Sequence, residues 1–132
     1  MKHILIVDDS STARLCIKTC IKSAGIRDVT FHEANNGKEA LSVLMNKKII
    51  PDLIVTDLNM PLMNGELLLK KVKSSPKFTD VPVVIITSTH NASLENRLTE
   101  CGAFAVLNKP VTAGSFSSVC DHLIPGAEPT WG

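Results

Sequence analysis

Short apolar runs recur along the chain at intervals of roughly 25 residues, and each is followed by a stretch with helical spacing of apolar residues. The runs at 53–56 and 83–86 are continuously apolar and rich in β-branched residues, which is typical of central strands covered on both faces. The run at 29–34 is more mixed, which suits an edge strand. The predicted strands are residues 4–7, 29–34, 53–56, 83–86 and 104–107. Strands that alternate with helices predict an open parallel α/β sheet.

Capping residues and helix breakers predict five helices in the intervals. The first helix is predicted to run from Ser10-Ser11 to Ala24-Gly25, and the second to start at Asn36-Gly37. The third should run from Asn64-Gly65 to Ser74-Ser75-Pro76, the fourth from Ser93 to Cys101 with Gly102 as its stop, and the fifth from Thr112, after Pro110, to Pro125-Gly126. In the third helix we expect Leu67, Leu68 and Val72 to face inward. In the first, one stripe contains Ala13, Cys16, Ile17, Cys20 and Ile21.

The length of 132 residues and the apolar content of 44% fit a single domain with a buried core. We expect this domain to cover residues 1–124, with a short, loosely held tail at 125–132 that includes Trp131. The net charge of +1 does not favour binding to nucleic acid or to a membrane surface. The N-terminal apolar run is too short for a signal peptide or a membrane span, so a cytoplasmic protein is expected. The sequence carries no output domain after its fifth predicted helix, so a stand-alone domain is expected.

The cysteines and histidines give weaker signals. Cys16 and Cys20 are four residues apart on one helix face, which would allow a metal or thiol role, but ordinary buried thiols are favoured for them and for Cys101 and Cys120. The four histidines are scattered, without partners at ligand spacing, and are expected to be structural or exposed. They are His3, His32, His90 and His122, of which His90 alone should lie near a functional site.

Polar residues that could carry chemistry follow four of the five predicted strands. Asp8 and Asp9 follow the first, Asp57 the third, Thr87 the fourth and Lys109 the fifth. Each alone has an ordinary explanation as a helix cap, a turn residue or a surface lysine. Together they are more informative, because the carboxyl ends of parallel strands form the ligand-binding edge of such a sheet. Three neighbouring carboxylates repel one another, so this arrangement predicts a bound cation and a nearby ammonium group.

The type of ligand indicates the cation and the reaction. Oxygen ligands without histidine or cysteine favour a hard cation, and Mg²⁺ suits a site that leaves room for water and a phosphate oxygen. Asp57, alone at the end of a central strand, is the predicted nucleophile toward phosphorus, whereas the pair Asp8 and Asp9 suits metal binding. Lys109 would neutralise charge on the transferred group, and the Thr87 hydroxyl could donate a hydrogen bond to it.

These residues resemble the receiver domains of two-component response regulators, and in layout the CheY type. The resemblance covers residues 2 to 124. It rests on Asp8-Asp9, on the segment Asp57-Leu58-Asn59-Met60-Pro61-Leu62-Met63-Asn64-Gly65, on Thr87-Ser88 and on Lys109-Pro110. It implies a flavodoxin-like, doubly wound five-stranded sheet in the order 2-1-3-4-5 with five helices, an order for which the CheY protein is a standard example.

The resemblance also implies roles for individual residues. Asp57 would accept a phosphoryl group from a sensor histidine kinase, a phosphotransfer protein or a small phosphodonor. Asp9, Asp57 and the Asn59 carbonyl would hold Mg²⁺, with Asp8 acting through water. Lys109 would contact the phosphoryl group, with its bond to Pro110 cis, and Thr87 would move toward it. The protein would then be a signalling phosphoacceptor rather than a conventional enzyme.

The switch would alter partner binding, and its expected read-out surface consists of the fourth helix, the fifth strand and the fifth helix, because these flank Thr87 and Lys109. One departure concerns that surface: Val106 stands where such domains often have Tyr or Phe, and Phe104 is placed too early in the strand to substitute. Thr89, His90 and Asn59 are expected to flank the water that attacks during dephosphorylation. A role in chemotaxis would follow only by analogy.

Three alternative functions fit parts of this pattern less well. A receiver-like interaction module that is never phosphorylated is the main alternative; the intact acidic site argues against it and Val106 weakly for it. A phosphatase of the haloacid-dehalogenase type needs a second Asp two residues after its nucleophile at the first strand, where this chain has Ser10. A flavin-binding module would need a glycine-containing, neutral loop after the first strand, and this loop is acidic.

Overall fold

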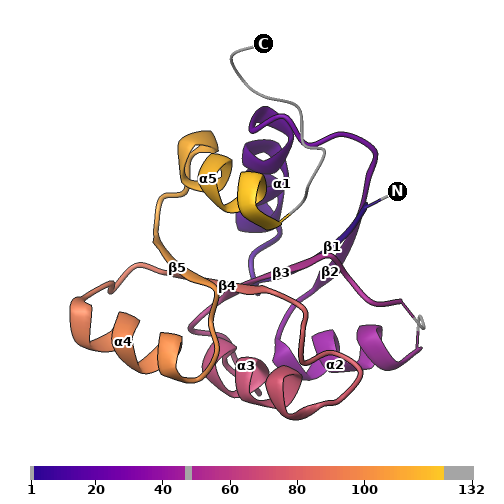
Figure 1. The fold of residues 1–132 in the computed structure, drawn as a ribbon, viewed down its shortest axis with the longest axis vertical. Coiled ribbons are helices and arrows are strands. Elements are labelled where there is room, and N and C mark those ends of the chain that lie inside the picture. The colour runs from indigo at the N-terminus through magenta and orange to yellow at the C-terminus, as the bar shows by residue number, and fades with distance from the viewer. Residues whose placement is uncertain (1, 47–48, 124–132) are drawn as a thin grey trace.

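The computed structural model describes residues 2–46 and 49–123, which form one five-stranded parallel sheet with helices on both faces (Figure 1). The strands are β1 (Lys2–Val7), β2 (Val29–Ala34), β3 (Leu53–Asp57), β4 (Val83–Thr87) and β5 (Ala105–Asn108). The helices are α1 (Ser11–Ser23), α2 (Gly37–Asn46), α3 (Gly65–Ser74), α4 (Ala92–Glu100) and α5 (Ala113–Leu123). The strand order β2-β1-β3-β4-β5 confirms the predicted topology.

Two apolar layers hold the helices to the sheet, in line with the doubly wound arrangement (Figure 1). On one face α2, α3 and α4 pack over residues such as Leu5 and Ile85. On the other, α1 and α5 pack over residues such as Ile4 and Ile86. Every residue of β3 and β4 is buried, as predicted for the central strands. β2 and β5 are the two edges.

The helix ends largely follow the predicted capping residues. Ser10 and Asn64 accept hydrogen bonds from main-chain N–H groups in the first turns of α1 and α3. The Asn36 side chain does the same at α2, and Thr112 at α5. α4 begins one residue earlier than predicted, because Asn91 is its cap. The predicted end of α5 at Pro125-Gly126 and the tail at 125–132 with Trp131 lie outside the described residues.

Two predictions were wrong in detail, one about the inward face of α3 and one about the first residue of β5. In α3 the inward residues are Leu68, Leu69 and Val72, whereas Leu67 is 43% exposed. Three consecutive leucines cannot all face one side of a helix, and the stripe set by Gly65 selects the other two. β5 begins at Ala105 rather than at Phe104, which is 46% exposed.

The thiols and imidazoles also differ from expectation. Cys16 was expected to be buried and is exposed, while Cys20 and Cys101 are partly buried; the side chain of Cys120 lies outside the described part. His3 and His32 were expected to lack a partner at ligand spacing. In the structure the two residues lie on the adjacent strands β1 and β2 and their rings stack on each other, with His3 Nδ1 3.0 Å from His32 Nε2. Strand register, which the sequence pattern does not specify for an edge strand, brings them together.

Candidate functional site

The predicted acidic residues meet at the carboxyl edge of the sheet. β3 ends at Asp57, and Asp8 and Asp9 directly follow β1, its neighbour in the sheet. One carboxylate oxygen from each of these three side chains lies within 4.8 Å of the others. Asp8 and Asp57 are almost fully buried, whereas Asp9 is exposed. This is the one group of three or more potential His, Cys, Asp or Glu ligands found within residues 2–46 and 49–123.

Asp8 is held by its own turn and by the edge strand. Its main-chain N–H donates to the Ala34 carbonyl at 3.0 Å, and its Oδ1 accepts from the Ser10 N–H at 2.9 Å. The Arg14 guanidinium donates to the Asp8 carbonyl at 2.6 Å. Asp8 Oδ2, by contrast, is buried and has no hydrogen-bond partner among the described residues. A buried carboxylate oxygen without a donor is costly, and a cation at this point would satisfy it.

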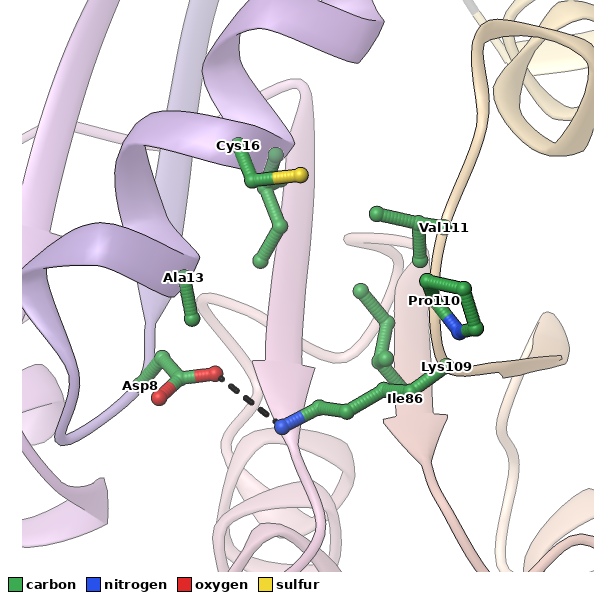
Figure 2. A pocket seen from close by; sticks show the side chains of 8 residues that line it. Asp8, Ala13, Cys16, Ile86, Lys109, Pro110 and Val111 are labelled. Atoms are coloured by element: carbon green, nitrogen blue, oxygen red, sulfur yellow. Dashed lines mark ion pairs between the residues drawn. The ribbon is translucent and has the colours of Figure 1, made fainter.

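Lys109 reaches the carboxylates of Asp8 and Asp57 from the loop after β5. Its main-chain N–H donates to the Thr87 carbonyl at 3.0 Å, which fixes the start of the loop after β5. Its Nζ lies 3.2 Å from Asp57 Oδ1 and 3.6 Å from Asp8 Oδ2, and Figure 2 shows its side chain extending toward Asp8. The predicted cis bond between Lys109 and Pro110 is confirmed. The predicted ammonium group therefore lies among the carboxylates.

The electrostatics of the site follow from burial and from this crowding. Burial raises the pKa of Asp57, the neighbouring Asp8 raises it further, and the attraction of Lys109 offsets only part of the rise. Burial alone would lower the pKa of Lys109, but Asp57 and Asp8 outweigh it and raise that pKa. The lysine is thus firmly cationic, and it does not by itself neutralise the carboxylates.

Gly65 sets the position of Asp57 through backbone packing. Its N–H donates to the Leu58 carbonyl at 2.9 Å, and a Cβ atom on Gly65 would collide with the main-chain oxygen of Asp57. The Leu58 N–H in turn donates to the Ile86 carbonyl at 2.9 Å. α3 can therefore start directly against the end of β3 only with glycine at this position. The sequence pattern marked Gly65 as a helix start and as part of a motif, but not as a spacer for Asp57.

Thr87 and its neighbours form the β4 side of the site. The Thr87 side chain is fully buried, and its Oγ1 accepts the Thr89 N–H and lies 3.1 Å from Thr89 Oγ1. His90 pairs with Glu95 of α4, with 2.8 Å between His90 Nε2 and Glu95 Oε2. Asn59, the remaining predicted ligand, is exposed in the loop after β3. In this conformation the Thr87 hydroxyl is therefore engaged with Thr89.

A cavity of about 320 Å³ opens beside the carboxylates, between α1 and the segment after β5 (Figure 2). Its far end is apolar, while Asp8 and Lys109 lie at the end nearer the acidic site. The lining residues are Asp8, Ala13, Cys16, Ile17, Ile86, Lys109, Pro110 and Val111. The sequence pattern did not reveal this cavity, because its two walls are far apart along the chain.

The donor set fits a hard divalent cation. Asp8, Asp9 and Asp57 offer oxygen atoms only, at spacings that one ion can bridge. Asp8 Oδ2 has no hydrogen-bond partner among the described residues, and its ion pair with Lys109 is long, at 3.6 Å. Burial and the neighbouring Asp8 raise the pKa of Asp57, so a further cation between these carboxylates would be favourable. The acidic cluster therefore fits the divalent metal that was predicted.

Comparison with known proteins identifies the family. Residues 4–120 match the family model of the response regulator receiver domain. The chain belongs to this family. The receiver domain is 38% identical to the two-component response regulator ORR5 of Oryza sativa subsp. japonica, covering 92% of this chain and 88% of that protein. It is 36% identical to the sensor histidine kinase CheAY of Helicobacter pylori, where the match covers 92% of this chain but 15% of the kinase.

Solved structures agree with this assignment and with the predicted fold. The chemotaxis protein CheY4 of Vibrio cholerae superimposes on the receiver domain with a TM-score of 0.80 and 26% identity, over 94% of this chain and 99% of that one. The Mn²⁺-bound form of response regulator Rcp1 gives a TM-score of 0.79 and 25% identity, over 98% and 99% of the two chains. The predicted CheY-like family and flavodoxin-like fold are therefore confirmed.

Membership of the family establishes the general role. Receiver domains are signalling phosphoacceptors that interact with histidine kinases or phosphotransfer proteins and with downstream targets. Within the described parts of the chain, no helix has the length and apolar character required to cross a membrane.

Proposed function

We propose that this receiver domain accepts a phosphoryl group on Asp57 in the presence of Mg²⁺ and thereby changes its binding to partner proteins. The observation that carries the proposal is the grouping of Asp8, Asp9 and Asp57 within 4.8 Å, with Lys109 Nζ 3.2 Å from Asp57 Oδ1. A nucleophilic carboxylate, further acidic ligands and an ammonium group are the parts that such a transfer requires.

In the proposed reaction a carboxylate oxygen of Asp57 attacks phosphorus and the bond from phosphorus to the donor breaks. The donor atom is a phosphohistidine nitrogen of a histidine kinase or phosphotransfer protein, or an oxygen or nitrogen of a small phosphodonor, as in acetyl phosphate and phosphoramidate respectively. The electron pair of that bond leaves with the donor atom, and Asp57 becomes a mixed anhydride with phosphate. Asp57 suits this role because it is the end of a fully buried strand, so its position is set before the donor arrives.

The other residues would bind and orient the groups. Asp8, Asp9, Asp57 and the main-chain carbonyl of Asn59 would hold Mg²⁺, which when bound neutralises charge on the transferred group. Lys109 would place its ammonium group against a phosphoryl oxygen, a short movement from its contact with Asp57. The Thr87 hydroxyl would donate to another phosphoryl oxygen, which requires it to leave Thr89.

The rearrangement of Thr87 and Lys109 gives the proposed route to partner proteins. Both lie next to α4, β5 and α5, and Phe104, which is 46% exposed, directly precedes β5 in the chain. Replacing Phe104 by Ala should weaken binding of a partner that recognises this face and leave phosphoryl uptake unchanged. A comparable loss of uptake would show that the face is part of the acceptor site and would contradict the division proposed here.

The test of the acceptor is the intact mass of the protein after incubation with Mg²⁺ and acetyl phosphate or phosphoramidate. The proposal predicts the added mass of one phosphoryl group, absent from Asp57→Asn and from a sample with the metal chelated. Failure of the wild type to gain this mass, together with failure to bind beryllofluoride, would contradict the proposal. That outcome would favour the alternative, a phosphorylation-independent interaction module, and Val106 would be the next residue to examine.

A further inference from the structure

Two thiols of α1 form a pair that the proposed phosphoryl chemistry does not use. Cys16 and Cys20 are separated by one helical turn and so lie on the same face of α1. Cys16 is exposed, and Figure 2 shows its sulfur pointing from α1 toward Val111 across the cavity. Cys20 is partly buried, and its Sγ donates to the Val111 carbonyl at 3.6 Å. Burial raises the pKa of the Cys20 thiol, and the adjacent Cys16 thiol raises it further, as expected for neighbouring sulfurs.

The surroundings of the pair differ from those of the acidic site. Near Cys16 the cavity is lined by the apolar side chains of Ile17, Pro110 and Val111. Asp8 and Lys109 lie at its other end (Figure 2). Cys16 therefore faces an apolar space, and Cys20 reaches the same wall through its contact with the Val111 carbonyl. The pair offers soft sulfur ligands and no hard oxygen ligand from a side chain in this part of the cavity.

Geometry distinguishes between two uses of such a pair. Residues four apart on a helix have Cβ atoms about 5–6 Å apart, whereas a disulfide requires a Cβ separation of about 3.5–4.5 Å. A disulfide would therefore distort α1. Thiolate–metal bonds of about 2.3 Å, as for zinc, allow two sulfurs bridged by one ion to be separated by up to about 4.6 Å. A bridging ion is thus compatible with an undistorted helix.

We propose that Cys16 and Cys20 bind one soft, monovalent metal ion of the Cu(I) class at the joint between α1 and the segment after β5. Binding would release both thiol protons and leave a bis-thiolate complex with one negative charge. Neither thiol is oxidised in this step, so no further reactant is required. The Cys20 S–H would no longer donate to the Val111 carbonyl, so the ion would also change the contact between α1 and this segment.

The number of ligands favours Cu(I) over Zn²⁺. Within the described residues, no third His, Cys, Asp or Glu joins this pair to form a cluster, since the one such group is the acidic site. Structural Zn²⁺ sites are almost always four-coordinate. Cu(I) prefers soft thiolates and is satisfied by two of them. The thiol pair and the acidic site would therefore select different metals, one soft and one hard.

The test is an anaerobic titration of the full-length, reduced protein with Cu(I) held by the coloured chelator bicinchoninate. Loss of the chelate colour reports transfer of Cu(I) to the protein. The reference variant carries Cys101→Ser and Cys120→Ser and so keeps only the pair on α1. Cys16→Ser or Cys20→Ser is then added to it singly, and circular dichroism and Mg²⁺ affinity verify that each variant is folded.

The proposal predicts that the wild type and the reference variant each take up one Cu(I) per chain. Adding Cys16→Ser or Cys20→Ser should weaken this binding by at least about 10- to 100-fold, because loss of a direct ligand should cost no less than loss of a supporting residue. Absence of uptake by the reference variant, or wild-type affinity after either single replacement, would overturn it. The assay contains no phosphodonor, so its failure would leave the proposed role of Asp57 unaffected.

Discussion

The two strand ends that meet at the acidic site are built differently. β3, which ends at Asp57, is buried along its whole length, lies between β1 and β4, and is closed by the tight start of α3 at Gly65. β5, which leads to Lys109, is an edge strand, partly buried over its first three residues and exposed at its last. The proposed acceptor therefore lies on the fully buried part of the sheet and the lysine on its more exposed edge.

This difference suggests how one small domain can both bind a phosphoryl group and signal. Elements that rearrange at low cost come from the less buried parts of a structure, whereas a nucleophile benefits from a fixed position. On this account, changes at the β3 end should damage stability and metal binding together. Changes at the β4–β5 side should affect the response more than the fold.

The largest expected effect on stability comes from a substitution at Gly65, which packs against the end of β3. Gly65→Ala places a Cβ against the main-chain oxygen of Asp57, which cannot move without disturbing β3. We expect a loss of about 3 kcal/mol in the free energy of unfolding, the upper part of the usual range for overpacking, together with weaker Mg²⁺ binding. Urea denaturation and a Mg²⁺ titration would measure the two effects.

Gly114→Ala is the matched control, since a Cβ there would make an ordinary 3.6 Å contact with Thr112 Oγ1. It should be neutral or stabilising by up to about 1 kcal/mol, as expected for glycine to alanine in a helix. Equal losses at Gly65 and Gly114 would show that the close approach of α3 to Asp57 is not what makes Gly65 necessary.

The next largest effect concerns the metal. Asp8→Asn removes the charge of the buried carboxylate whose Oδ2 lacks a hydrogen-bond partner among the described residues. Mg²⁺ affinity should fall by about 10- to 100-fold, the range found for residues that support a metal site. Calorimetric titration would measure it, with Asp80→Asn, exposed and far from the acidic cluster in sequence, as the control. Unchanged affinity in Asp8→Asn would remove Asp8 from the proposed site.

A smaller effect should appear in the stability of the metal-free protein. Because burial and Asp8 raise the pKa of Asp57, the ionised carboxylate opposes folding, and protonation relieves this penalty. Asp57→Asn should therefore be more stable than the wild type by about 1 kcal/mol near neutral pH, a typical size for one substitution. The difference should shrink as the pH falls through the raised pKa of Asp57, since the wild type then gains the stabilising proton.

Thermal or urea unfolding at several pH values, without metal, would measure this dependence. Saturating Mg²⁺ is the control condition, because it should stabilise the wild type more than Asp57→Asn. A wild type that is the more stable of the two at neutral pH without metal would contradict the described electrostatics.

The smallest effect on stability is expected for a substitution at Thr89, in the loop that follows β4. Thr89→Ala removes the hydroxyl 3.1 Å from Thr87 Oγ1 but keeps the main-chain N–H that donates to it. We expect a loss of about 0.5 kcal/mol in stability, at the low end for a hydrogen bond, and faster phosphoryl uptake because Thr87 is released more easily. Urea denaturation and the rate of mass gain with acetyl phosphate would test this. Slower uptake would show that Thr89 assists the reaction instead of restraining Thr87.

The sequence predicted the strands and the acidic edge well because both depend on strong local signals. Continuous apolar runs such as 53–56 mark buried strands, and parallel topology then brings their carboxyl ends together. The amino-acid pattern alone was therefore sufficient to place Asp57 and Lys109 at one edge. The prediction that Leu67 rather than Leu69 faces inward was wrong, because the inward face depends on how α3 packs on the sheet.

The features that were missed depend on contacts between distant segments. The pair of His3 and His32 requires the β1–β2 register, and the cavity beside Cys16 requires α1 to face a segment about 90 residues away, as shown by the Cys20–Val111 separation of 91. No periodic pattern encodes either contact. Val106, identified from sequence as a departure, packs on the core while partly exposed, and its effect on switching stays a prediction.

The most direct test of the central claim is to locate the phosphoryl group on the chain. The protein would be phosphorylated with acetyl phosphate and Mg²⁺, reduced with borohydride, which converts an aspartyl phosphate to homoserine, and then analysed by peptide mass spectrometry. The account predicts homoserine at position 57 and at no other aspartate. Homoserine at position 8 or 9, with Asp57 intact, would contradict it.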